Sequence, residues 1–103
     1  MTVPLIDAAF TGSVIEWRGP APFYFVALPD DLIAEVRWAA TQASYGWGCV
    51  PVHAEVDGVS FTTSLFPRNG GYLLPLKLAV RRQVGAVADD MLNVRMVIAA
   101  PQA

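Results

Sequence analysis

Four basic side chains lie in a stretch without any acidic residue, which runs from Gly58 to Ala88: Arg68, Lys77, Arg81 and Arg82. Lys77 and Arg81 are four residues apart, so on a helix they would share a face, where two like charges destabilise by roughly 0.2–0.5 kcal/mol. Lys77 would also stand in the first turn, where a cation opposes the helix dipole. These two unfavourable placements of positive charge suggest that a bound anion offsets them.

The sequence therefore predicts a pocket for a carboxylate or phosphate group at the loop and helix start between Arg68 and Arg81. Loop glycines and the start of a helix add free backbone N–H groups to such a pocket. The alternative is that Lys77 and Arg81 pair internally with an acidic residue, Glu16, Asp89 or Asp90, and fix the helix on the rest of the fold. The candidate ligand-binding residues are Arg68, Gly70, Gly71, Tyr72, Lys77, Arg81 and Trp47.

Catalytic residues are harder to assemble. His53 is the only histidine, and a strand would place it across from Thr62 and diagonal to Ser64, roughly 7–8 Å away. A hydrolase built from Ser64, His53 and Glu55 would lack the sharp turn that exposes a nucleophile and an oxyanion-hole motif. Cys49 lies four strand residues from His53, roughly 13 Å, which excludes a thiol dyad. We therefore expect no catalytic residue, no cofactor and no metal site.

Two tryptophans have distinct roles in this interpretation. Trp47 lies between two glycines, where it either plugs the end of a barrel or lines a pocket. Trp38 lies on the outward face of an expected helix. Exposed aromatic side chains are typical anchors of interfaces. We therefore predict that Trp38 contacts a partner chain or a neighbouring element.

The whole chain has the composition of one globular domain, residues 1–103, with 54% hydrophobic and 16% charged residues. No segment reaches the ~20 apolar residues of a membrane span. A single cysteine and the lack of a basic segment before an apolar run at the N-terminus favour the cytoplasm. The net charge of −2 and four clustered bases disfavour nucleic acid as a partner.

The elements that must position these residues are short. We expect strands over 10–17, interrupted by Gly12, and over 23–28, the second covered on both faces. Pro29 begins a helix that runs to about Gln42, with its buried face at Leu32, Ile33, Val36, Ala39, Ala40 and Ala43. A further short strand lies near Tyr72. Pro75 begins a second helix that ends at Gly85, with Leu76, Ala79, Val80 and Val84 facing inward.

The clearest local pattern is a β-hairpin. Strict alternation over 50–56 precedes Asp57-Gly58, a strong two-residue turn, and a return strand over 59–65. A two-residue loop fixes the register, so Val56 pairs with Val59 and His53 with Thr62. Residues 91–98 form the last strand, with Leu92, Val94, Met96 and Ile98 on one face.

Several motifs occur in one order along most of the chain: Trp47-Gly48-x-Val50-Pro51-Val52, Thr63-Ser64-Leu65-Phe66-Pro67, Tyr72-Leu73-Leu74-Pro75-Leu76-Lys77 and Val80-Arg81. From Phe10 to about Ile98 the chain resembles a bacterial family, domain of unknown function family nineteen-oh-five. The resemblance implies a double-split β-barrel similar to the AbrB and MazE type, and it carries no activity. Relatives tend to have Gly-Asp where this chain has Asp89-Asp90, and we expect Asp to tolerate the left-handed turn.

The sequence thus predicts a mainly β fold, a double-split β-barrel of about six strands with two short helices. We interpret it as a non-enzymatic binding or interaction module whose partner is another protein or a small anionic ligand. An AbrB-like nucleic-acid-associated regulator is the rival class, and a small hydrolase comes third. Monomer and homo-oligomer both remain open.

Overall fold

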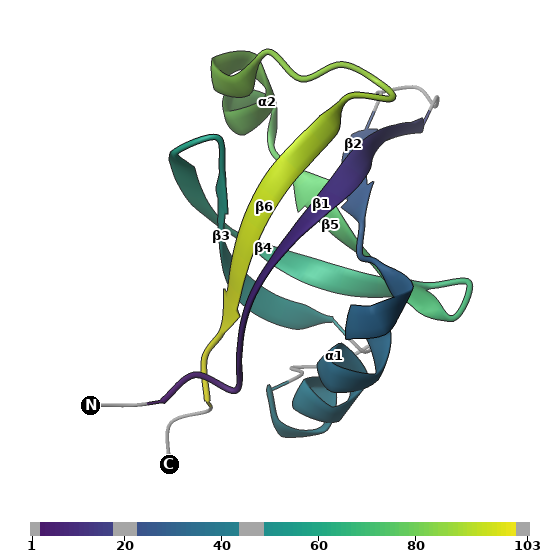
Figure 1. Ribbon diagram of the computed structural model, residues 1–103, viewed down its shortest axis with the longest axis vertical. Coiled ribbons are helices and arrows are strands. Elements are labelled where there is room, and N and C mark those ends of the chain that lie inside the picture. The colour runs from purple at the N-terminus through teal and green to yellow at the C-terminus, as the bar shows by residue number, and fades with distance from the viewer. Residues whose placement is uncertain (1–2, 18–22, 44–48, 101–103) are drawn as a thin grey trace.

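The computed structural model describes residues 3–17, 23–43 and 49–100, and it confirms a mainly β fold with six strands and two helices (Figure 1). Within these residues neither helix is long and apolar enough to cross a membrane. The elements in chain order are β1 (Ile6–Trp17), β2 (Phe23–Ala27), α1 (Asp30–Ala43), β3 (Val50–Val56), β4 (Val59–Arg68), β5 (Gly71–Leu76), α2 (Leu78–Val84) and β6 (Met91–Ile98).

The six strands form a closed antiparallel barrel in the order β1-β2-β5-β4-β3-β6. The long strand β1 closes it, because residues 6–13 pair with β6 and residues 14–17 pair with β2. β1 therefore begins four residues earlier than we expected and continues through Gly12 without a break. Gly12 leaves room for a side chain of β2 rather than interrupting the strand, since an added Cβ would lie 2.5 Å from Cγ1 of Val26.

The hairpin of β3 and β4 has the register that the sequence predicts, with Val56 opposite Val59 and His53 opposite Thr62. Asp57 and Gly58 both have positive φ, 48° and 82°, as a two-residue hairpin turn requires. The alternation places residues 50, 52, 54 and 56 in the interior and their neighbours outside. The pattern in the sequence was sufficient here because the turn and both strands specify the same face.

A second two-residue turn joins β4 to β5. Asn69 and Gly70 have φ values of 51° and 78°, and Arg68 pairs with Gly71 on either side of them. The loop that we expected at this point is therefore a tight hairpin turn. It carries the Asn-Gly pair that this turn type prefers.

Pro75 lies inside β5, paired with Phe25 of β2, and does not begin the second helix. Helix α2 begins at Leu78, and Lys77 is its N-cap residue with extended backbone, φ −64° and ψ 150°. The prediction that Pro75 begins a helix was wrong because proline also fits in a strand, at a position where the backbone N–H would have no partner on the neighbouring strand.

Three prolines stand where neighbouring strands separate. Successive residues of β5 turn their backbone groups alternately to β2 and to β4, and the Tyr72 carbonyl accepts a hydrogen bond on the β2 side. Pro75 therefore faces β4, which pairs with β5 only as far as Leu73. The same alternation turns Pro51 and Pro67 toward sides where the described strands form no ladder. Each proline thus marks an opening in the barrel without breaking a hydrogen bond of the sheet.

The core is apolar, and the two helices lie at opposite ends of the barrel (Figure 1). Helix α1 buries Val36 and Ala39, as its pattern predicts, and α2 buries Val80. Ala79 is exposed, which corrects our expectation that it faces inward; a helix starting at Leu78 turns it to solvent. The last strand buries Leu92, Val94, Met96 and Ile98, as the sequence predicts.

Two further points concern surfaces and turns. Strand β2 is covered on both faces at its centre, where Phe25 and Val26 are 6% and 0% exposed, whereas Phe23 at its start is 59% exposed. Asp89 adopts φ 72°, so an aspartate occupies the left-handed position before β6. Its N–H donates to the carbonyl of Val14 at 2.9 Å, which ties the turn to β1. The turn therefore forms without glycine.

Candidate functional site

The barrel separates the basic residues that the sequence groups together. Arg68 ends β4 beside the β4–β5 turn, whereas Lys77 follows the far end of β5, six residues beyond Gly71. At about 3.3 Å per extended residue these positions are roughly 20 Å apart. Arg81 lies one helical turn beyond Lys77, and its N–H donates to the Lys77 carbonyl at 2.9 Å. Lys77 is the N-cap residue with extended backbone, so it precedes the helix instead of lying in its first turn.

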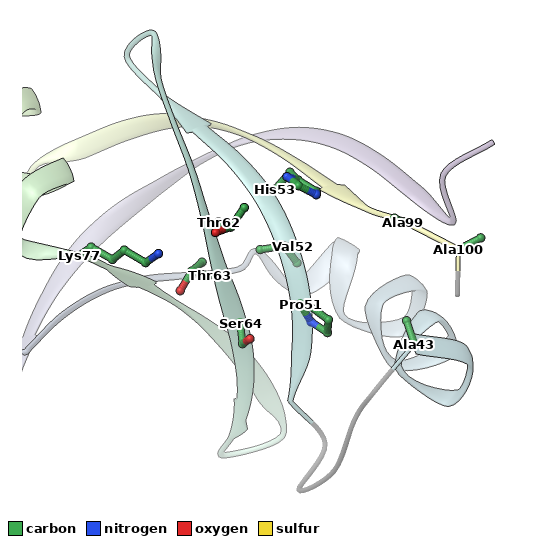
Figure 2. Close-up of a pocket in the computed structure, with 10 residues that line it drawn as sticks. All are labelled: Ala43, Pro51, Val52, His53, Thr62, Thr63, Ser64, Lys77, Ala99 and Ala100. Atoms are coloured by element: carbon green, nitrogen blue, oxygen red, sulfur yellow. The ribbon is translucent and has the colours of Figure 1, made fainter. Parts of the chain in front are cut away.

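Lys77 reaches a groove that runs along the β3–β4 hairpin, which we call the Lys77 groove. It has a volume of about 500 Å³. Figure 2 shows the ammonium end of Lys77 directed toward β4, while the end of α1 and the residues after β6 flank the opposite side. The described lining residues are Ala43, Pro51, Val52, His53, Thr62, Thr63, Ser64, Lys77, Ala99 and Ala100.

The chemistry of the Lys77 groove is that of a donor surface. Its described lining has one ammonium group, one imidazole and the hydroxyls of Thr62, Thr63 and Ser64, and it contains no carboxylate. Among the described residues the Lys77 side chain has no hydrogen bond and no ion pair. The register turns the backbone groups of Thr62 away from β3, toward the opening where β5 no longer pairs. Three kinds of donor therefore line one groove, with Thr62 and Thr63 on opposite faces of β4.

Arg81 is used internally. Its guanidinium carbon lies 3.7 Å from the centroid of the Tyr24 ring, and the Tyr24 hydroxyl donates a hydrogen bond to Oε2 of Glu16. This hydrogen bond raises the pKa of the Tyr24 hydroxyl above its ordinary value of 10.0; burial and the charge of Glu16 act in the same direction, and Arg81 opposes them. Arg81 is thus held within the protein by the Tyr24 ring, a contact that differs from the pairing with an acidic residue that we considered.

Arg68 stacks on a different aromatic ring. Its guanidinium carbon lies 3.9 Å from the centroid of Trp17, on the outer surface of the barrel. The adjacent turn is tied to α1, because Nη2 of Arg37 donates to the Gly70 carbonyl at 3.0 Å. Tyr72 is buried, 7% exposed. The turn residues that we grouped with Lys77 therefore belong to a separate region.

The sequence did not reveal an aromatic cluster outside the barrel, formed by Trp17, Phe23, Phe25 and Phe66. The centroid of the Phe25 ring lies 4.8 Å from that of Trp17 and 5.2 Å from that of Phe66, both edge to face. It lies 6.5 Å from the ring centroid of Phe23. These residues come from β1, β2 and β4, so only the strand order brings them together. The sequence signal that could have revealed the cluster is the alternation of each strand, because each of these aromatic residues faces away from its buried neighbours in the same strand.

The two tryptophans of the sequence prediction have different outcomes. Trp38 is 55% exposed and lines a mostly apolar hollow with Leu5, Ile6, Ala34 and Glu35, between α1 and the start of β1. It therefore lies beside a neighbouring element, and its role at an interface stays a prediction. Trp47 lies outside the described residues.

The residues considered for catalysis in the sequence are His53, Glu55 and Cys49, together with Ser64. Oγ of Ser60 donates to Oε1 of Glu55 at 3.5 Å, and the His53 imidazole makes no hydrogen bond within the described ranges. Cys49 is a free thiol. No three of the described His, Cys, Asp and Glu residues are grouped closely enough to hold a metal ion.

The described residues form a small closed β-barrel with a donor-rich groove along the β3–β4 hairpin. The chain matches the family described as Domain of unknown function (DUF1905) over residues 10–96, and it belongs to that family. No curated protein matches the chain significantly.

Proposed function

We propose that this barrel is a non-enzymatic binding module and that its ligand carries a carboxylate or phosphate group that binds in the Lys77 groove. The observation that carries the proposal is an ammonium group without an acidic partner in a groove whose described lining has no carboxylate. The proposal narrows the predicted anion site to Lys77. Arg68 and Arg81 stack on Trp17 and Tyr24 instead.

The groove offers an anion both charge and hydrogen bonds. The ammonium has three donors, and the hydroxyls of Thr62 and Thr63 can donate in addition. An exposed ion pair contributes only about 0–1 kcal/mol, whereas a hydrogen bond to a charged group contributes about 1.5–3 kcal/mol. Affinity for a bare anion is therefore modest, and the body of the ligand must add contacts along the hairpin.

The arrangement favours binding over catalysis. A nucleophilic enzyme needs a base that is oriented by a third group. In the described residues the His53 imidazole has no hydrogen-bond partner, and the Glu55 carboxylate accepts a hydrogen bond from Ser60. The cytoplasm stays the proposed compartment, since the chain has one cysteine and that thiol is free.

A titration with inorganic phosphate, followed by amide NMR, tests the proposal. We expect saturable shifts at Thr62, Thr63 and Lys77 and an affinity about tenfold lower in Lys77→Met, since about 1.4 kcal/mol is a factor of ten. Arg82→Gln is the matched control, because it removes one exposed positive charge that does not line the groove. Equal effects of the two substitutions would refute a specific site. A salt-dependent shift of DNA mobility by the protein would instead favour the nucleic-acid-associated class.

A further inference from the structure

A second hollow, of about 440 Å³, lies on the outer surface of the barrel beside the β4–β5 turn. We call it the Arg68 hollow. Outward side chains of Ile15 and Leu73 and the helix residue Ile33 give it apolar walls. Its volume is in the range of sites for small molecules, about 300–1,000 Å³. It shares no described lining residue with the Lys77 groove.

Two opposite charges line this hollow without meeting. Arg68 and Asp30 are the only charged side chains in its described lining, and they form no ion pair with each other. Within the described ranges Asp30 accepts no hydrogen bond through its carboxylate. Both groups are exposed, so water now solvates them. The described lining of the hollow is therefore neutral as a whole and has a positive and a negative pole.

Trp17 fixes the position of the positive pole. The Arg68 guanidinium lies over the indole, 3.9 Å from its centroid, and makes no hydrogen bond to a described residue. A guanidinium that stacks through its face keeps its in-plane N–H donors available for a carboxylate, which it can bind in a bidentate manner. The stacking thus orients the cation without using the donors.

The two poles select the charge pattern of a ligand. A purely anionic ligand would be attracted by Arg68 and repelled by Asp30. A purely cationic ligand would be attracted by Asp30 and repelled by Arg68. A zwitterion can form a favourable interaction with each of the two side chains. From this we infer that the Arg68 hollow binds an apolar α-amino acid, with its carboxylate on Arg68, its ammonium group on Asp30 and its side chain against Ile33 and Leu73. This site is independent of the Lys77 groove.

Three related probes test the inference on the wild-type protein: L-leucine, N-acetyl-L-leucine and L-leucinamide. The second lacks the ammonium charge and the third lacks the carboxylate. In an amide NMR titration we expect leucine to shift Asn69, Gly71 and Leu73, and each capped probe to bind about tenfold more weakly. Absence of binding by leucine, or equal affinities for the three probes, would overturn the inference without any variant.

Substitutions then assign each pole. Arg68→Gln should abolish the preference for leucine over leucinamide, and Asp30→Asn should abolish the preference for leucine over N-acetyl-leucine. Lys77→Met should leave leucine binding unchanged, so failure of the phosphate site and failure of this site are distinguishable. Retention of both preferences in folded Arg68→Gln and Asp30→Asn proteins would also overturn the assignment.

Discussion

Gly12 supports the sharpest prediction about the barrel, since β1 crosses there from β6 to β2. A Cβ at this position would lie 2.5 Å from Cγ1 of Val26 and 3.0 Å from the carbonyl oxygen of Ala27. Carbon atoms in contact normally lie about 3.5–4.0 Å apart. Val26 is fully buried, so its side chain has no space to withdraw into. Gly12→Ala therefore overpacks the barrel interior.

The magnitude follows from two opposing terms. Overpacking a well-packed core destabilises by about 1–3 kcal/mol. Replacing glycine by alanine at an unstrained position stabilises by about 0.4–1 kcal/mol through the unfolded chain. We expect a net loss of about 1–2 kcal/mol for Gly12→Ala. In a domain of this size that corresponds to a fall in Tm of roughly 5–10 °C.

Urea denaturation measures this difference, and Gly71→Ala is the matched control. Gly71 also lies in a strand, but a Cβ there would meet only ordinary contacts, 3.6 Å from Cδ1 of Ile33 and 3.7 Å from the carbonyl of Arg68. We expect the control to be neutral or slightly stabilising. Val26→Ala combined with Gly12→Ala should destabilise by about 1 kcal/mol less than the sum of the single changes. Strict additivity, or a Gly12→Ala protein as stable as wild type, would refute the reasoning.

Three further predictions concern charge and association. Nε and Nη2 of Arg95 donate to the Asp7 carboxylate at 3.2 and 3.0 Å and hold the pKa of that carboxyl below its ordinary value of 3.8. A lowered folded-state pKa gives stability that is present above pH 3.8 and lost as the pH falls through the folded value. The stability difference between wild type and Arg95→Gln, measured by denaturation across pH, should therefore vanish in acid; a difference that persists there contradicts the pair. Glu16→Gln should lower the pKa of Tyr24 in an ultraviolet titration, because it removes the carboxylate that accepts the hydrogen bond of the Tyr24 hydroxyl. An unchanged pKa would argue against the hydrogen bond between Tyr24 and Glu16. Trp38→Asp should weaken any self-association seen by analytical ultracentrifugation, and unchanged sedimentation would argue against an interface at this residue.

The parts of the fold that the sequence predicted correctly are those where local signals agree. Asp57-Gly58 and the alternation on both sides of it specify one register, and the structure has that register. Helix α1 buries Val36 and Ala39 because its apolar period is that of a helix. Asp89 adopts the left-handed conformation that its short polar side chain tolerates.

The errors arise where one residue type has two physical uses. Pro75 was interpreted as a helix start, but its missing N–H equally suits the open side of β5. Gly12 was interpreted as an interruption, whereas it provides space for a side chain of the neighbouring strand. Asn69-Gly70 is a two-residue hairpin signal that we treated as a loop. In each case the choice depends on a neighbouring strand, which the local sequence does not specify.

The candidate site was also predicted only in part, because its grouping depends on the strand arrangement. The sequence left open whether Lys77 pairs with an acidic residue or serves a ligand, and in the described residues its side chain has no partner. It could not separate Lys77 from Arg68 and Arg81, because that depends on the direction of β5 and on the start of α2. The aromatic partners of the two arginines, Trp17 and Tyr24, come from β1 and β2, far away in the sequence.

Lys77 is the only lysine in the chain, so selective labelling gives a single side-chain ammonium resonance. The most direct test of the binding function is to follow that resonance while inorganic phosphate is added at constant ionic strength. An anion site in the Lys77 groove predicts a saturable shift with the same dissociation constant as the amides of Thr62 and Thr63. A resonance that does not respond, or that changes equally with chloride, would contradict it.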